Sequence, residues 1–195
     1  MTLVVVASNV LVRYPVEGSI GALSLADLLT YGAFTYPVAF LVTDLTNRRF
    51  GLVAAQKVIL AGFLVAVVLS AFLSSPRIAV ASASAFLAGQ MLDALAFDML
   101  RRSGGWWRAP LLSSLAGSAL DTAIFFSLAF APGFEALGAG DDFAVAAAPL
   151  FGLMAPEVPR FVSWAIADFS VKTFFALVML APYRGLAAIT EPERA

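Results

Sequence analysis

Long apolar runs alternate with short polar connections along most of this chain of 195 residues. The runs are continuous and longer than strands, so each of them predicts a helix. About 20 apolar residues in a helix cross the roughly 30 Å hydrocarbon core of a bilayer. The pattern therefore predicts an all-α integral membrane protein, one domain over residues 1–195 with a bundle of six transmembrane helices. The predicted spans are 2–16, 22–44, 50–74, 78–100, 109–131 and 160–182.

The segment 132–159 interrupts this pattern. It is rich in Gly, Ala and Pro and carries four acidic residues, so it is predicted to be an external loop. Its apolar run 143–154 has only twelve residues, a length that favours a helix lying on the membrane or dipping into it. In the second span, Pro37 predicts a kink that frees a backbone carbonyl near Ala33.

Composition agrees with a membrane protein. Hydrophobic residues make up 61% of the chain and charged residues 13%, whereas soluble domains average about 45–50% and 25%. The formal net charge is −1 and there is no basic tract, which argues against a nucleic-acid partner. Cysteine and histidine are absent, so disulfides and the usual zinc ligands are excluded, and no metal or cofactor is predicted.

Arginines in short connections predict the orientation, because loops rich in them stay in the cytoplasm. One side carries seven: Arg48, Arg49, Arg101, Arg102, Arg108, Arg184 and Arg194. The other side carries three: Arg13, Arg77 and Arg160. Both termini are therefore predicted to be cytoplasmic. Asp44 and Asp98 lie close to the first set in sequence and are predicted to form ion pairs at the membrane interface.

Six polar or aromatic positions inside the predicted spans are candidate ligand-binding residues: Gln90, Asp93, Asp121, Trp164, Asp168 and Lys172. An ionisable side chain near mid-membrane is costly, so each one requires a partner, water or a function. Asp121 lies near the middle of its span, and Gln90 precedes Asp93 by three residues on nearly the same helix face. The other three recur every four residues and form one stripe on the last span.

Structural roles are the alternative for the same residues. Asp168 and Lys172 could form an i,i+4 ion pair that neutralises itself. Asp93 and Asp121 could instead hydrogen-bond between helices. With Lys57 included, three deep acids oppose two deep bases, which leaves one carboxylate for a cation, a proton or a hydrogen-bond donor.

Two neighbouring predicted spans contain similar sequences. The sequence LAGQMLDALAF at 87–97 aligns without gaps to LAGSALDTAIF at 115–125, and six of the eleven positions match. Duplicated helices that carry equivalent polar groups are a common way to build a transport site, although alanine-rich spans also resemble one another through composition. In both segments, small residues such as Gly89 and Gly117 predict close approach between helices.

Several segments resemble the bacterial queuosine precursor transporters, also called the vitamin uptake transporter family. They are YGAFTYPVAFLVTDLTNRRFG, AGQMLDALAFDML, WWRAPLLSSLAGSALDTAIFFSLAF and WAIADFSVKTFFALVMLAPYR. The resemblance also includes Asn9 in the first span and the segment ADLLTYGAF before the second, so it covers nearly the whole chain.

The resemblance implies a bacterial inner-membrane transporter, without enzymatic activity, that imports 7-cyano-7-deazaguanine and 7-aminomethyl-7-deazaguanine for salvage into the queuosine of tRNA. A carboxylate can accept hydrogen bonds from the edge of such a ring, and an aromatic side chain can stack on its face. The six candidates above have this chemistry. Asn9, Tyr31, Tyr36 and Lys57 are further candidates.

Three classes of function compete at this point. The first is a secondary transporter acting alone, with an intramembrane acid coupling uptake to protons. The second is the substrate-capture subunit of an energy-coupling-factor transporter, a six-helix fold of similar size that requires a separate ATPase, since this chain has no Walker motif. An intramembrane enzyme is disfavoured, because no spaced motif binds a metal or builds a triad. The energy source and a homodimer both stay open.

Overall fold

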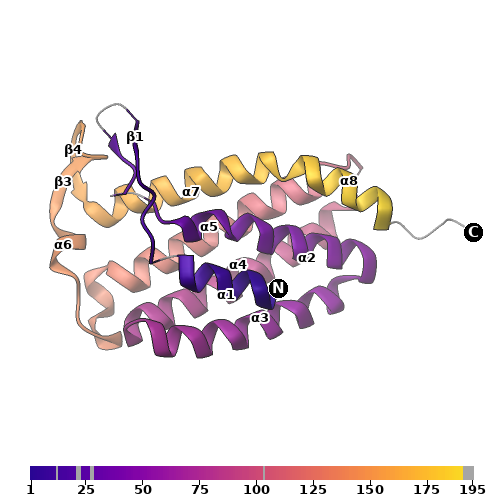
Figure 1. Cartoon of the computed structure of the whole chain (residues 1–195), viewed down its shortest axis with the longest axis horizontal. Helices are drawn as coiled ribbons and strands as arrows, with labels where there is room; N and C mark the ends of the chain where they lie inside the picture. Colours follow the sequence, from indigo (N-terminus) through magenta and orange to yellow (C-terminus); the bar gives the residue numbers. More distant parts are fainter. Residues whose placement is uncertain (12, 21–22, 27–28, 103, 191–195) are drawn as a thin grey trace, which may run out of the picture.

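A bundle of long helices lying side by side forms the body of the protein (Figure 1). The computed structural model describes residues 1–11, 13–20, 23–26, 29–102 and 104–190. Within these residues, four helices are long and apolar enough to cross a membrane: α3 (Leu52–Leu73), α4 (Pro76–Leu100), α5 (Arg108–Phe130) and α7 (Arg160–Val178). Each begins within two residues of a predicted span, so a multi-pass helical membrane protein is confirmed.

The first two predicted spans are wrong in their bounds, and the six-span count is not confirmed. The helices there are α1 (Thr2–Leu11), with 10 residues, and α2 (Tyr36–Phe50), with 15. Fifteen residues rise about 22 Å in a helix, less than the hydrocarbon thickness. Ahead of α2 lie two short antiparallel strands and a 3-10 helix: β1 (Ser19–Ile20), β2 (Leu23–Ser24) and η1 (Tyr31–Phe34). Residues 21–22 and 27–28 of this region lie outside the described residues.

Pro37 begins a helix and does not kink one. It is the second residue of α2, after the N-cap residue Thr35, and a proline in the first turn loses no helical hydrogen bond. The Thr35 hydroxyl donates to the carbonyl oxygen of Gly32 at 2.6 Å and stabilises the turn between η1 and α2. The predicted mid-span kink is therefore wrong, because the helix starts only at Tyr36.

The chain between α5 and α7 folds over one end of the bundle (Figure 1). It contains η2 (Pro132–Leu137), α6 (Asp142–Val145) and the antiparallel strands β3 (Ala147–Leu150) and β4 (Met154–Pro159). None of these elements is a candidate span, as predicted for 132–159. The run 143–154 contributes to α6, β3 and β4, however, and so does not form one membrane-surface helix. At the opposite end, α7 is followed by α8 (Leu180–Thr190).

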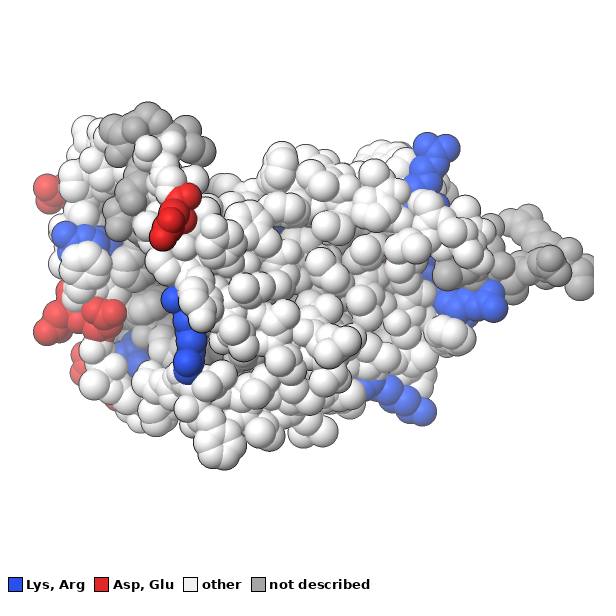
Figure 2. Space-filling view, viewed as in Figure 1, with Lys and Arg blue, Asp and Glu red and all other residues white. Residues whose placement is uncertain are grey.

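The outer surface of the bundle is apolar. Large side chains such as Phe72, Leu64 and Phe174 are 85%, 64% and 60% exposed, as expected for a surface in contact with lipid tails. Charged side chains are nearly absent from the middle of the face shown in Figure 2 and lie mainly towards its two ends. On this face, acidic side chains gather at the end that carries β3, β4 and α6, whereas only basic side chains are visible at the end of α8.

Helices α4 and α5 pack through a reciprocal glycine contact. A Cβ atom added at Gly89 would lie 2.8 Å from the Cβ of Asp121 and 2.9 Å from the Gly117 carbonyl oxygen. A Cβ at Gly117 would in turn lie 2.9 Å from the Cβ of Asp93 and 2.7 Å from the Gly89 carbonyl oxygen. The glycines thus bring the two backbones together and fix their register. The similar segments 87–97 and 115–125 therefore pack against each other, and the glycine of each faces the aspartate of the other.

Arg77, which is 2% exposed, stabilises the end of α5 beneath the 132–159 segment. Its Nε donates to the Leu128 carbonyl at 2.9 Å and its Nη2 to the Ala131 carbonyl at 2.6 Å. These carbonyls end a helix and have no partner within it, and a cation there is favoured by the helix dipole. The guanidinium therefore holds this end of α5 by two directed hydrogen bonds.

The substitution Arg77→Lys is expected to lower the free energy of unfolding by about 1.5 kcal/mol, because lysine cannot make both of these charged hydrogen bonds. The measurement is thermal unfolding in detergent, with hydrogen exchange to monitor residues 128–145. The matched control is Arg13→Lys, since the exposed Arg13 makes one similar bond to the Leu73 carbonyl at 3.0 Å. Its expected change is within about 0.5 kcal/mol. Equal effects of the two substitutions would contradict this role of Arg77.

Candidate functional site

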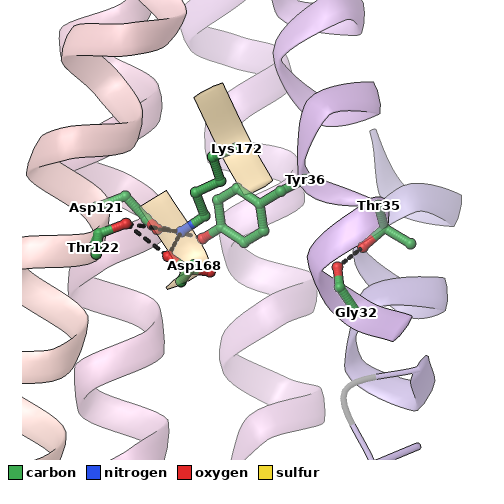
Figure 3. Close-up of polar contacts among 7 residues, drawn as sticks. All are labelled: Gly32, Thr35, Tyr36, Asp121, Thr122, Asp168 and Lys172. Atoms are coloured by element: carbon green, nitrogen blue, oxygen red, sulfur yellow. Dashed lines mark hydrogen bonds and ion pairs between the residues drawn. The ribbon is translucent and has the colours of Figure 1, made fainter. Parts of the chain in front are cut away.

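Lys172 of α7 lies between two aspartates inside the bundle (Figure 3). Its Nζ atom is 2.6 Å from Oδ2 of Asp121 and 2.6 Å from Oδ2 of Asp168. The Thr122 hydroxyl also accepts a hydrogen bond from Nζ at 3.2 Å. The lysine side chain is only 5% exposed, so this is a charged cluster removed from solvent. Such a cluster is costly unless its hydrogen bonds are satisfied.

Two hydroxyl groups complete the cluster. Tyr36 donates to Oδ1 of Asp121 at 2.6 Å, and Thr122 donates to Oδ2 of Asp168 at 2.7 Å. The Lys172 ammonium also lies 4.5 Å from the centre of the Tyr36 ring, a cation–π geometry. The cluster therefore joins the start of α2 to the middle of α5 and α7 (Figure 3).

Local sequence explains how these side chains meet. Asp168 and Lys172 are four residues apart on α7 and share one face of the helix. Asp121 and Thr122 are adjacent on α5 and both reach α7. Tyr36 is the first residue of α2, so the turn that begins this helix directs its ring to α5 and α7. The predicted i,i+4 ion pair on α7 is confirmed, but it is one part of a larger network.

A cavity of about 320 Å³ lies beside the cluster. Its apolar wall includes Phe125, Phe126, Phe130 and Trp164, and its polar wall includes Ser8, Asn9, Thr30 and Ser82. The Trp164 ring packs against Phe130 with ring centres 5.5 Å apart, so the aromatic wall is continuous across α5 and α7. Cavities of about 300–1,000 Å³ with an apolar wall and a few polar groups are typical of small-molecule sites.

Six of the ten predicted residues line this cavity: Asn9, Tyr36, Asp121, Trp164, Asp168 and Lys172. Tyr31 and Lys57 do not line it, and both are exposed, with the Tyr31 ring packed against Phe34. Lys57 thus does not contribute to the charge around the cavity, where two aspartates oppose Lys172.

Gln90 and Asp93 lie in a second buried cluster. The Gln90 side-chain oxygen accepts from the Thr43 hydroxyl at 2.7 Å. Asp93 accepts from the Ser114 hydroxyl at 3.5 Å, and Asp44, which is 2% exposed, lies near it. Gln90 and Asp93 do not line the cavity of about 320 Å³, so their part in ligand binding stays a prediction.

Asp44 is a residue whose place the sequence did not indicate. It was predicted to form an interface ion pair, as Asp98 does with Arg101 at 2.6 Å. The structure shows that it is buried, with 2% of its surface exposed, whereas its ion pair stays a prediction. It also lines a small cavity of about 20 Å³ that contacts Lys172, Ser118 and Tyr183 and has room for about one water molecule. Lys172 thus borders both cavities.

Thr122 and the phenylalanines of the cavity wall were also not identified from the sequence as candidate site residues. Thr122 follows Asp121 and looked like an ordinary polar residue of the span. A signal was present only for Phe125, which follows Asp121 by four residues and so lies on nearly the same helix face. Phe126 and Phe130 are rotated about 140° and 180° from Asp121 around an ideal helix, so spacing alone did not indicate them.

These features define a multi-pass helical membrane protein with a charged cluster beside a ligand-sized cavity, an arrangement typical of membrane transporters. The chain belongs to the family described as "Putative vitamin uptake transporter", which matches residues 30–75 and 70–186. The family resemblance found in the sequence is thereby confirmed.

Two curated relatives carry a more specific name. The chain is 38% identical over 148 residues to the "Queuosine precursor transporter" of Escherichia coli (strain K12), an alignment that covers 66% of this chain and 64% of that protein. It is 35% identical over 153 residues to the "Probable queuosine precursor transporter" of Haemophilus influenzae, with 65% of each chain covered. The chain thus spans slightly less than two thirds of the length of these relatives. No solved structure matches it.

Proposed function

We propose that this protein imports 7-cyano-7-deazaguanine and 7-aminomethyl-7-deazaguanine across the bacterial inner membrane for the synthesis of queuosine in tRNA. The observation that carries the proposal is the Asp121–Lys172–Asp168 cluster at the edge of an aromatic cavity of about 320 Å³. The names of the two relatives support the same substrate class.

The cavity suits a flat heterocycle rich in hydrogen-bond donors. The rings of Phe126, Phe130 and Trp164 supply faces on which a fused ring can stack, as proteins do with single-stranded bases. Carboxylates accept hydrogen bonds, and the ring N–H and exocyclic amine of a deazaguanine donate them. Stacking and acceptance at Asp168 together orient the ligand with one edge towards the charged cluster.

The proposed orientation places both termini in the cytoplasm. The end bearing Arg101 and Arg102 is rich in basic residues, and short basic loops favour the cytoplasm. The cavity is also lined by Ala26, Leu29 and Thr30, from the segment at the opposite end. In this orientation the structure corresponds to a protein whose binding cavity lies towards the outside.

Queuosine content of tRNA tests the proposal in cells that lack both the synthesis of the precursors and their own importer. With nanomolar 7-cyano- or 7-aminomethyl-7-deazaguanine in the medium, wild-type protein is expected to restore queuosine. Asp121→Asn is expected to reduce uptake at least tenfold at equal protein abundance, since it removes the acid that holds both Lys172 and Tyr36. The control Asp142→Asn changes an exposed acid outside the bundle and is expected to retain uptake.

The outcome also separates a lone transporter from a capture subunit. Uptake by this chain in a host without energy-coupling-factor ATPases supports a secondary transporter. Absence of uptake, together with ligand binding by the purified protein, would instead indicate a subunit that requires an energising partner. Absence of both uptake and binding would overturn the proposed substrate.

A further inference from the structure

We infer that the cavity prefers a cationic ligand, with Asp168 as the residue that receives its positive charge. This inference rests on the proposed function, and it adds an order of preference: 7-aminomethyl-7-deazaguanine, which carries an alkylammonium group at neutral pH, over the neutral 7-cyano compound.

The first support is the charge of the cavity wall. Among the described residues that line it, Asp121 and Asp168 are acidic and Lys172 is basic. Two negative charges and one positive charge leave a net charge of −1. A carboxylate without a counter-charge is costly away from water, so the empty cavity favours a ligand or a proton that supplies a positive charge.

The second support is the occupancy of the hydrogen-bonding atoms. An ammonium group has three donors, and Lys172 donates hydrogen bonds to Asp121 and Thr122 and forms an ion pair with Asp168. Both oxygens of Asp121 are engaged, Oδ1 by Tyr36 and Oδ2 by Lys172. Lys172 is therefore held by two carboxylates and one hydroxyl of the protein, which makes it a poor partner for an anionic ligand.

Asp168 is different from Asp121. Its Oδ2 atom contacts Lys172 and Thr122, but its Oδ1 atom has no hydrogen-bond or ion-pair partner in the described part of the chain. Its side chain is 20% exposed, against 3% for Asp121. Asp168 thus presents one free acceptor oxygen at the cavity, and the unbalanced negative charge lies there.

The surroundings favour an organic cation. The aromatic residues Phe126, Phe130 and Trp164 line the cavity, and the face of an aromatic ring attracts a positive charge. The hydroxyls of Ser8, Thr30 and Ser82 line the cavity without side-chain hydrogen bonds within the described residues, so they can pair with the polar edge of the heterocycle. An ammonium group bound to Oδ1 of Asp168 would then neutralise the net charge of −1 that remains after Lys172 has balanced one of the two aspartates.

Three ligands with one ring system and different charges test this inference on the wild-type protein. They are the 7-aminomethyl (+1), 7-cyano (0) and 7-carboxy (−1) derivatives of 7-deazaguanine, with binding to purified protein measured by calorimetry at pH 7. The aminomethyl compound is expected to bind at least tenfold more tightly than the cyano compound, and the carboxy compound most weakly. This series does not depend on the folding of any variant.

Variants of Asp168 then test whether this residue receives the positive charge of the ligand. Asp168→Asn is expected to reduce the preference for the aminomethyl over the cyano compound to less than about threefold, mainly through weaker binding of the cation. Asp168→Glu keeps the charge and is expected to keep the order of preference. Asp142→Asn makes the same chemical change on an exposed residue and is expected to leave both dissociation constants unchanged.

The outcomes separate this inference from the proposed function. Equal binding of the aminomethyl and cyano compounds to wild type overturns the cation preference and leaves the proposed substrate class in place. A preference that survives unchanged in Asp168→Asn overturns the role of Asp168. If neither compound binds to folded wild type, the proposed function fails, and the inference fails with it.

Discussion

Replacement of Lys172 by methionine is expected to destabilise the protein by about 3–5 kcal/mol. Methionine fills a similar volume but leaves the carboxylates of Asp121 and Asp168, previously 2.6 Å from the ammonium, without their shared cation. Removal of one partner from a buried ion pair typically costs this much, because the remaining charge stays away from water. The measurement is unfolding of the purified protein in detergent, followed by circular dichroism and fluorescence.

Two comparisons make this result specific. Lys57→Met removes the other lysine of the helices, but Lys57 is exposed on α3, and the expected change is within about 0.5 kcal/mol. In the second comparison, Asp121→Asn is introduced into the Lys172→Met protein. Asp121→Asn is expected to lower the free energy of unfolding less in this protein than in wild type, with a coupling energy of about 0.5–3 kcal/mol, because the cation that pairs with Asp121 is already absent. Equal stability losses for the two lysine variants would refute the role assigned to Lys172.

The sequence predicted the four long helices well because their signal is local. A continuous apolar run of about 20 residues sets the length of a span without reference to the rest of the fold. The bounds of α2 were predicted poorly because the apolar sequence around Pro37 is compatible with two structures. One is a long helix kinked at the proline, and the other is a shorter helix with the proline in its first turn. The structure has the second, with strands and a 3-10 helix before it.

The candidate site was predictable only as far as spacing along one helix determines it. The interval of four residues between Asp168 and Lys172 was sufficient to predict their pairing. The partnership of Asp121 with Lys172 was not, because it depends on how far α5 is shifted along α7. Asp93 occupies the position in α4 that matches Asp121 in α5, yet it accepts a hydrogen bond from Ser114 and does not line the cavity. Equivalent positions on two helices packed against each other need not join the same cluster.

The register of α4 against α5 is therefore decisive for the site, and the glycine contact sets it. Gly89→Ala and Gly117→Ala are each expected to cost about 3 kcal/mol, the upper part of the usual range for overpacking. The reason is that each added methyl group would lie within 3 Å of a backbone oxygen and of an aspartate Cβ on the facing helix. Backbone atoms cannot move aside as the end of a flexible side chain can.

These two substitutions also make a functional prediction, which unfolding temperature and ligand binding can test together. Because the methyl group at Gly89 would press on Asp121, the helix that carries the cavity wall must shift, and ligand binding is expected to weaken at least tenfold. The matched control is Gly185→Ala on α8, where an added Cβ meets nothing within 4 Å. That substitution is expected to be neutral or to stabilise by up to about 1 kcal/mol, since alanine favours a helix over glycine. Similar behaviour of all three alanine variants would show that the α4–α5 contact does not position Asp121.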